Sequence, residues 1–269
     1  MGVFPALLLG AVQGVTEFWP ISSSAHLALL IHVFGWGEPD LSFMVALHVG
    51  TWIAVVWFYR RRLWSIVSAC WREARGGERG NPDARLGWLL LLATVPGVVL
   101  AAVFAESSEM MEGMPLLMAV ALAVFGLVLW AADMRGSERR DWRAAGWREA
   151  LVVGVGQALA LMPGVSRSGI SISVARAAGI ERKEAADFAF LLSVPITGAA
   201  AAYEGFKLLR EGFPAGGLWP MLAGGAAAAA VGYLAIGFLL SRLQGHTFRA
   251  YAIYRLLLAA ILLVVLVII

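Results

Sequence analysis

A polar break, Gln13-Gly14-Val15-Thr16-Glu17-Phe18-Trp19-Pro20-Ile21-Ser22-Ser23-Ser24-Ala25-His26, interrupts the largely apolar start of this chain. The apolar stretches on either side, 2–16 and 25–36, are each too short to cross a hydrocarbon core about 30 Å thick, because a helix rises only about 1.5 Å per residue. Two half-length helices joined by a polar break predict a re-entrant helical hairpin. Such a break survives at membrane depth only when it is buried in protein or lines a wet cavity.

A second break, Gln157 to Gly169, repeats this arrangement later in the chain. It includes Pro163-Gly164-Val165-Ser166-Arg167-Ser168-Gly169 and lies between the half-length apolar segments 150–162 and 169–180. The sequence therefore predicts a second hairpin of the same kind.

The composition indicates a membrane protein. Of the 269 residues 60% are apolar and 14% are charged, whereas soluble domains are about a quarter charged. Six segments are long and apolar enough to span a bilayer: 41–59, 86–105, 114–132, 186–206, 218–241 and 250–269. We expect an all-α polytopic membrane protein with six transmembrane helices and two re-entrant hairpins.

The arginines orient this membrane protein, because loops on the cytoplasmic side collect Lys and Arg. Most of the chain's 21 basic residues fall in alternate connections: 60–85, 133–149, 176–184 and 242–249. We expect these connections in the cytoplasm, and both termini on the extracytoplasmic side. Arg255, near the cytoplasmic end of the sixth span, is expected to extend toward the interface.

With this orientation the two hairpins enter the membrane from opposite faces, which is an inverted repeat. At a constant offset of 144, residues Gly10, Gln13, Ser22 and Ser24 match Gly154, Gln157, Ser166 and Ser168. We expect one membrane domain, 1–269, with repeats at about 1–133 and 150–269. Inverted repeats with broken helices commonly place a binding site where the breaks meet.

Glu17 is the only acid among residues 1–37, and a carboxylate inside a membrane costs several kcal/mol unless it is paired or hydrated. Gln13 lies one helical turn before it, on the same face. In the following break, His26 comes three residues after Ser23, which places a base near a hydroxyl. His32 and His48 have no such neighbourhood and are expected to be packing or interfacial residues.

Arg167 is the only charged residue between Leu151 and Ala175, so a buried cation needs an anion. Glu17 is one candidate partner. Two serine-led helix starts facing one cavity also offer backbone N–H groups and positive dipole ends, a combination suited to phosphate. Arginine holds phosphate oxygens in a fork, and Glu17 is suited to bind a divalent cation that bridges phosphates.

These motifs resemble the bacterial undecaprenyl-diphosphate phosphatases of the bacitracin-resistance type. The resemblance rests on Gln13 to Phe18, Pro20 to His26 and Pro163 to Gly169, and it covers essentially the whole chain, including Phe190 to Pro195 and Tyr254-Arg255. Many members of the family have a second glutamate where this chain has Gln13.

The resemblance implies hydrolysis of a polyprenyl diphosphate to its monophosphate and inorganic phosphate, which recycles the lipid carrier of peptidoglycan synthesis and confers bacitracin resistance. It implies a divalent metal, Mg²⁺ or Ca²⁺, held by Glu17 and Gln13, and a location in the bacterial inner membrane. The residues that it implies for phosphate binding are Ser22, Ser24, Ser166, Arg167, Ser168 and Gly169. We expect Ser23 to attack phosphorus with His26 as its base, Glu17 to bind metal and Arg167 to stabilise charge, with His26 as the alternative nucleophile.

The main competing function is a secondary transporter or lipid-phosphate flippase, since inverted repeats with broken helices are a transporter architecture. Transport needs no nucleophile beside a base, so Ser23 and His26 favour hydrolysis. The expected partners are the polyprenyl diphosphate and membrane lipids, with a homodimer as an option and no nucleic acid.

Overall fold

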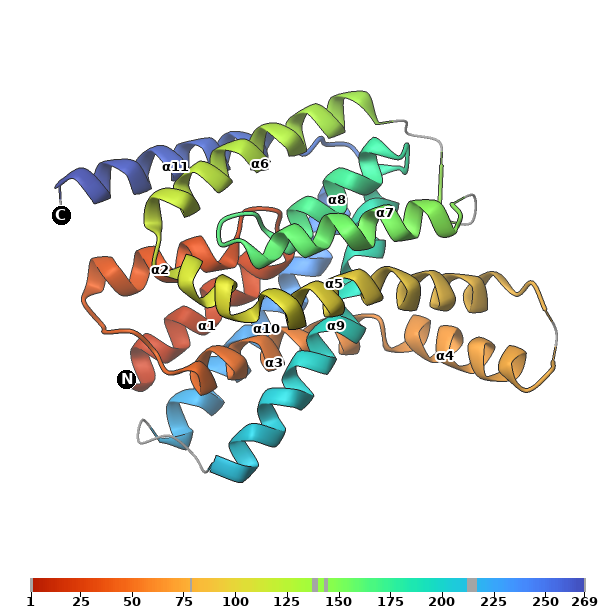
Figure 1. The fold of residues 1–269 in the computed structure, drawn as a ribbon, viewed down its shortest axis with the longest axis horizontal. Helices are drawn as coiled ribbons and strands as arrows, with labels where there is room; N and C mark the ends of the chain where they lie inside the picture. Colours follow the sequence, from red (N-terminus) through yellow and green to blue (C-terminus); the bar gives the residue numbers. More distant parts are fainter. Residues whose placement is uncertain (1, 78, 137–139, 143–144, 212–216, 269) are drawn as a thin grey trace.

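The computed structural model describes residues 2–77, 79–136, 140–142, 145–211 and 217–268. Across these residues the regular structure is helical, apart from one isolated bridge between Arg140 and Ile180. This confirms the expected all-α membrane fold (Figure 1). Within the described ranges, five helices are long and apolar enough to cross a membrane.

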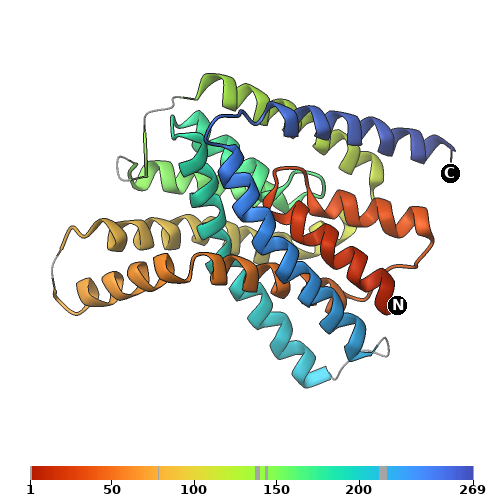
Figure 2. The same cartoon turned by 180° about the vertical axis from the view of Figure 1, so that it is seen from behind.

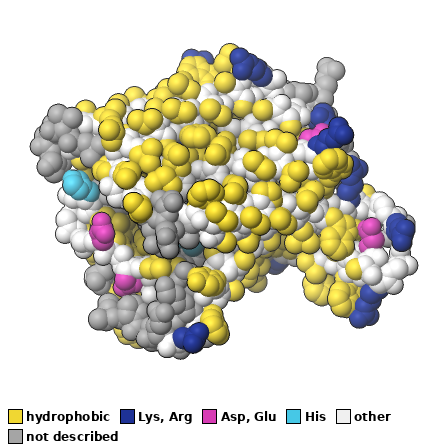
Figure 3. Space-filling view, viewed as in Figure 1, with side chains coloured by type: hydrophobic (Ala, Val, Ile, Leu, Met, Phe, Trp, Pro, Cys, Tyr) yellow, Lys and Arg dark blue, Asp and Glu magenta, His cyan; other side chains and the backbone are white. Residues whose placement is uncertain are grey.

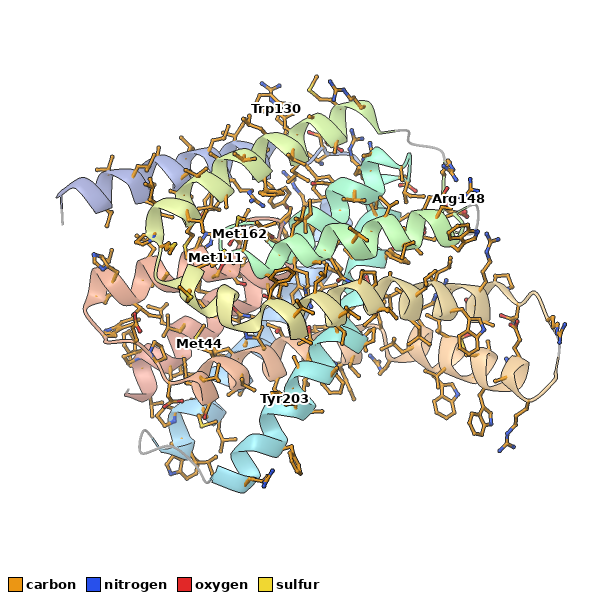
Figure 4. The ribbon with its side chains drawn as sticks, in the orientation of Figure 1. Met44, Met111, Trp130, Arg148, Met162 and Tyr203 are labelled. Atoms are coloured by element: carbon orange, nitrogen blue, oxygen red, sulfur yellow. The ribbon has the colours of Figure 1, made fainter. Side chains whose placement is uncertain are left out.

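The two polar breaks form helical hairpins, as the sequence predicts. The first consists of α1 (Val3–Phe18) and α2 (Ser23–Phe34). The second consists of α7 (Trp147–Ala158), the short 3-10 helix η1 (Leu159–Leu161) and α8 (Arg167–Ala177). Met162, labelled in Figure 4, lies in the second break near the middle of the molecule, whereas Arg148 lies at the outer end of α7.

Five of the six predicted spans are confirmed: α3 (Leu41–Phe58), α5 (Pro82–Glu112), α6 (Pro115–Arg135), α9 (Arg182–Glu211) and α10 (Leu218–Arg242). The helix α5 continues past the predicted end and bends at Phe104, whose backbone is not helical (φ −111°, ψ 16°). The sixth predicted span coincides with α11 (Arg249–Ile268), and Ile269 lies outside the described residues. One amphipathic helix, α4 (Arg60–Ala74), lies in the arginine-rich loop 60–85.

The termini and α4 mark opposite ends of the molecule. Both chain ends lie at one side. At the other side, α4 and the first part of α5 project together from the rest of the molecule (Figures 1 and 2). We call these the terminal end and the α4 end. The visible face is a broad apolar surface, with most Lys and Arg side chains gathered toward the α4 end (Figure 3). The basic side chains therefore mark one end of the apolar surface.

Glycines let the first hairpin approach the spans closely. A Cβ on Gly10 of α1 would lie 2.2 Å from the Gly224 carbonyl oxygen of α10, and one on Gly50 of α3 would lie 2.2 Å from that of Gly225. Small residues at helix crossings are typical of membrane interfaces. The first contact holds α1, and with it Glu17, against α10, and the second holds α10 against α3.

An acid inside the α4 end joins four parts of the chain. The Asp133 carboxylate of α6 lies 3.2 Å from Arg176 Nε of α8 and 2.7 Å from Arg182 Nε of α9. It also accepts a 2.9 Å hydrogen bond from the Phe248 amide, just before α11. Arg176 is fully buried, so this arginine of the segment 176–184 helps to hold the fold together.

The helix α11 packs along α6, whereas α10 packs against α1 and α3. Contacts between α10 and α11 are few. The consecutive helices α10 and α11 therefore diverge from the turn that joins them (Figure 2).

Candidate active site

Glu17 lies at the centre of the polar contacts between the hairpins. Its Oε1 lies 2.7 Å from Arg167 Nη2, and its Oε2 accepts hydrogen bonds from Ser23 Oγ at 2.8 Å and Gln13 Nε2 at 3.2 Å. His48 Nε2 lies 4.0 Å from Oε2. The Glu17 side chain is only 9% exposed. These partners stabilise the buried Glu17 side chain, because an ionised carboxylate away from water needs ion pairs or hydrogen bonds.

The two breaks share an unusual backbone. Ser22 (φ 74°) and Ser166 (φ 70°) are the only non-glycine residues with positive φ in the described part of the chain. Each is the N-cap of the helix that follows, so Ser23 is the first residue of α2 and Arg167 the first of α8. Such a conformation costs on the order of 1–3 kcal/mol and clusters at functional sites. In each hairpin the residue after this serine, Ser23 or Arg167, contacts the Glu17 carboxylate.

Arg167 is fixed by a second partner. Its Nη1 donates a 2.5 Å hydrogen bond to Thr197 Oγ1 of α9, while Nη2 contacts Glu17. The guanidinium is therefore held by a hydroxyl and a carboxylate from different elements. The structure brings together Gln13, Glu17, Ser23 and Arg167, as the sequence predicts.

His26 lies in the same hairpin but has other partners. Its Nδ1 is 2.7 Å from the Ser22 carbonyl oxygen, to which it donates, so the neutral ring accepts at Nε2 from Tyr254 Oη at 2.8 Å. The two rings are also stacked, with centroids 5.5 Å apart. Ser23 instead donates to Glu17. The pairing of Ser23 with His26 stays a prediction, and the described geometry favours Glu17 as the base beside Ser23.

The remaining predicted phosphate ligands are engaged within and between the loops. Ser22 Oγ lies 3.1 Å from Ser24 Oγ, and Ser166 Oγ lies 3.2 Å from Ser168 Oγ. The Gly169 amide donates to Ser166 Oγ at 3.2 Å. Ser168 Oγ donates to the Trp19 carbonyl and Ser24 Oγ accepts from the Gly164 amide. These residues hold the two breaks against each other, and their contact with phosphate stays a prediction.

Arg255 does not extend toward the interface, so that expectation is wrong. Its side chain is 0% exposed. The guanidinium donates to the carbonyls of Gly164 and Val165 at 2.8 and 2.9 Å, and to those of Leu122 and Pro20 at 3.2 and 3.4 Å. One arginine of α11 therefore binds the backbone of both breaks, which lack helical partners for these carbonyls.

Four residues near the site were not assigned to it from the sequence. His48 was expected to be a packing or interfacial residue, and Thr197, Tyr254 and Arg255 were given no place in the site. His48 reaches the site from α3, Thr197 from α9, and Tyr254 and Arg255 from α11. A single sequence carries no signal of such contacts between helices. Tyr254 and Arg255 are adjacent, and this pair supported the family resemblance without indicating a place in the site.

The donors around Glu17 suit a divalent cation shared with phosphate. The described residues contain no group of three or more His, Cys, Asp or Glu side chains able to hold a metal alone. Gln13 Oε1 is buried and has no hydrogen-bond partner, so an oxygen ligand is available one turn from the carboxylate. Mg²⁺ is typically held by one or two carboxylates together with substrate phosphates, and this small oxygen set fits that mode of binding.

Two helical hairpins that meet around a buried carboxylate, hydroxyl and guanidinium define this chain as a polytopic membrane protein with an intramembrane polar site. It belongs to the bacitracin resistance protein BacA family, whose model matches residues 6–261. A relative from Moorella thermoacetica is 43% identical over 266 residues, covering 98% of each chain, and one from Gemmatimonas aurantiaca is 40% identical over 261 residues, covering 97% of each. Both are named undecaprenyl-diphosphatase, as is a relative from Chromohalobacter salexigens that is 41% identical and covers 95% of this chain and 96% of its own.

Proposed function

We propose that this protein hydrolyses undecaprenyl diphosphate to undecaprenyl monophosphate and inorganic phosphate, and so recycles the lipid carrier of cell-wall synthesis and confers resistance to bacitracin. The family and its relatives, which match along nearly the whole chain, support this activity. The observation that carries it is the contact of both Ser23 and Arg167 with Glu17. A transporter needs no nucleophile held on a carboxylate, so the transporter alternative is disfavoured.

Ser23 is the nucleophile in this proposal. Its hydroxyl already donates to Glu17 Oε2, so the carboxylate is placed to take the proton as Oγ attacks the terminal phosphorus. The bond from phosphorus to the bridging oxygen breaks, and the polyprenyl monophosphate leaves. Water then hydrolyses the phosphoserine to release phosphate.

Arg167 stabilises the charge that develops on phosphorus. The guanidinium presents several donors, and only part of them are used by Glu17 and Thr197. Phosphate oxygens are held well by such a planar fork.

Glu17 and Gln13 would hold the divalent metal, Mg²⁺ or Ca²⁺. When bound, such an ion neutralises phosphate charge and polarises the phosphorus–oxygen bonds. Arg167 and Ser23 would then share the carboxylate with the metal.

The first test is phosphate release by the purified protein from undecaprenyl diphosphate in the presence of Mg²⁺. We expect turnover by the wild type and a loss of about 10²–10³-fold in kcat for Arg167→Lys, because the bidentate donor is lost. Arg135→Lys, an exposed position at the end of α6, serves as the matched control and should retain activity. A wild type that binds the lipid but releases no phosphate would favour the transporter.

Trapping identifies the nucleophile. With terminally labelled substrate and parallel rapid quenches in acid and in neutral detergent, we expect an acid-stable phosphoserine that disappears in Ser23→Ala and persists in His26→Ala. An acid-labile adduct that remains in Ser23→Ala would make His26 the nucleophile and exclude this assignment.

We also place the protein in the bacterial plasma membrane, with both termini and the opening of the site on the extracytoplasmic side. The gathering of arginines at the α4 end supports this orientation. A homodimer remains an option that is independent of the site, since one chain supplies every residue named above.

A further inference from the structure

An apolar groove leads away from the candidate site along α1, α10 and α11. Its volume is about 880 Å³. At the inner end it is lined by Ile21, His26 and Tyr254, which belong to the first break and its contacts. The walls are apolar along most of the groove, with residues such as Val15 and Phe238.

The divergence of α10 and α11 creates this groove. The helix α10 packs against α1 and α3, while α11 packs along α6, so few contacts close the space between α10 and α11. Exposed apolar side chains on both helices, among them Phe238 and Ile253, face this region. The groove therefore connects the interior of the protein with the lipid around it.

The groove adjoins the first break at His26, close to the proposed nucleophile in the chain. His26, in its wall, binds the carbonyl of Ser22, which directly precedes Ser23. A lipid whose diphosphate lies at Ser23 and Arg167 must direct its chain along an apolar path, because an isoprenoid chain cannot cross the polar surroundings of Glu17 without displacing them.

We propose that this groove binds the prenyl chain of the substrate and leads it sideways into the bilayer between α10 and α11; the proposal rests on the proposed function. Because lipid tails are as apolar as the groove, its walls supply little hydrophobic driving force. The contribution of the groove is its shape: it accommodates a long prenyl chain while the diphosphate lies at Ser23 and Arg167.

The basic residues at the far end of the groove do not form a phosphate site. Arg242, His246 and Arg249 lie there, but the Arg249 guanidinium packs over the Trp130 ring of α6, with 5.5 Å to its centroid. Trp130 lies on the outer side of the molecule in Figure 4. His246 Nδ1 lies 3.1 Å from the Arg242 carbonyl. These side chains therefore do not converge on one point, which favours a chain in the groove over the headgroup of a lipid from the cytoplasmic leaflet.

Substrates of different chain length test this inference. Ala250→Trp adds a large side chain to an exposed position in the groove, one helical turn before Tyr254. We expect kcat/KM for undecaprenyl diphosphate to fall about tenfold or more, the size of effect that exclusion from an apolar pocket produces. The value for farnesyl diphosphate, whose chain is much shorter, should change less than about twofold. Ile261→Trp, exposed on the same helix but outside the groove, is the control and should affect neither substrate.

Equal loss with both substrates, or no loss with either, would overturn the proposal. Photolabelling gives an answer that is independent of turnover. A non-cleavable polyprenyl methylene-diphosphonate with a photoreactive chain end should label residues 231–254 of the wild-type protein, and Ala250→Trp should reduce that labelling. Labelling confined to other helices would exclude the groove. Labelling at 231–254 by a protein that releases no phosphate would support binding of the prenyl chain in the groove and contradict the proposed activity.

Discussion

Arg255 shows how one side chain determines the geometry of the site without lying in it. A permanent cation that is fully buried normally has an acid beside it, but the hydrogen bonds described for Arg255 go to backbone carbonyls. These carbonyls belong to both breaks and to α6. The charge of Arg255 therefore satisfies backbone that the broken helices leave without partners, and it joins the loop before Ser23 to the loop before Arg167.

Arg255→Met should lower both stability and activity. Each hydrogen bond to a charged group contributes about 1.5–3 kcal/mol, and four carbonyls would lose a donor, so we expect a clear fall in melting temperature and a loss of more than tenfold in phosphate release. Arg255→Lys should recover only part of the activity, since an ammonium cannot reach both loops in a fork. Thermal unfolding in detergent, with Arg135→Met as the exposed control, measures the effect. A melting temperature unchanged from that of the wild type would contradict this role.

At the scale of elements, a glycine contact positions the first hairpin, formed by α1 and α2. Gly10, Gln13 and Glu17 lie on the same face of α1, and Gly10 touches the backbone of α10 at Gly224. Any side chain at position 10 must push α1 outward, and it would carry the carboxylate of Glu17 with it. The packing of one small residue is thereby coupled to the distances around the nucleophile.

Gly10→Ala adds only one methyl group, but it should reduce activity strongly. Its Cβ would meet the Gly224 oxygen at 2.2 Å, and a displacement of about 1 Å at a catalytic group can cost on the order of 10²-fold in rate. Gly237→Ala on α10, where a Cβ would lie 3.6 Å from the Phe58 ring, should be nearly neutral. Comparing kcat for the two variants separates helix displacement from the general effect of replacing glycine.

Much of the fold was predictable from the sequence because membrane elements are limited by length. Half-length apolar segments around the two breaks predicted both hairpins, and Glu17 and Arg167 indicated the site because isolated charges inside a membrane need partners. The burial of Arg255 and the approach of His48 to Glu17 were not predictable, since those partners come from other helices. The hydrogen bond between His26 and Tyr254 was not predictable for the same reason, because Tyr254 lies on α11. The spacing along the first hairpin indicated only Ser23 as a partner of His26.

At the scale of the whole molecule, the basic residues predict an orientation that thiol labelling can test. Cys70 of α4 is the chain's one cysteine, and burial raises the pKa of its thiol, which would slow its reaction. In a Cys70→Ser background, we expect Glu38→Cys to react with a membrane-impermeant maleimide in intact cells. Arg72→Cys, on α4, should react only after the membrane is permeabilised. The reverse pattern would place α4 outside and contradict the orientation.

The position of Arg255 in the chain has a consequence for biosynthesis. Gln13, Glu17, Ser23, His26 and Arg167 are all translated before α11, yet the arginine that ties their two loops together is on α11. A nascent chain that ends before α11 would contain the proposed nucleophile and its carboxylate but would hold the loops without their common donor. Hydrolysis should therefore reach its full rate only when α11 has entered the membrane and docked.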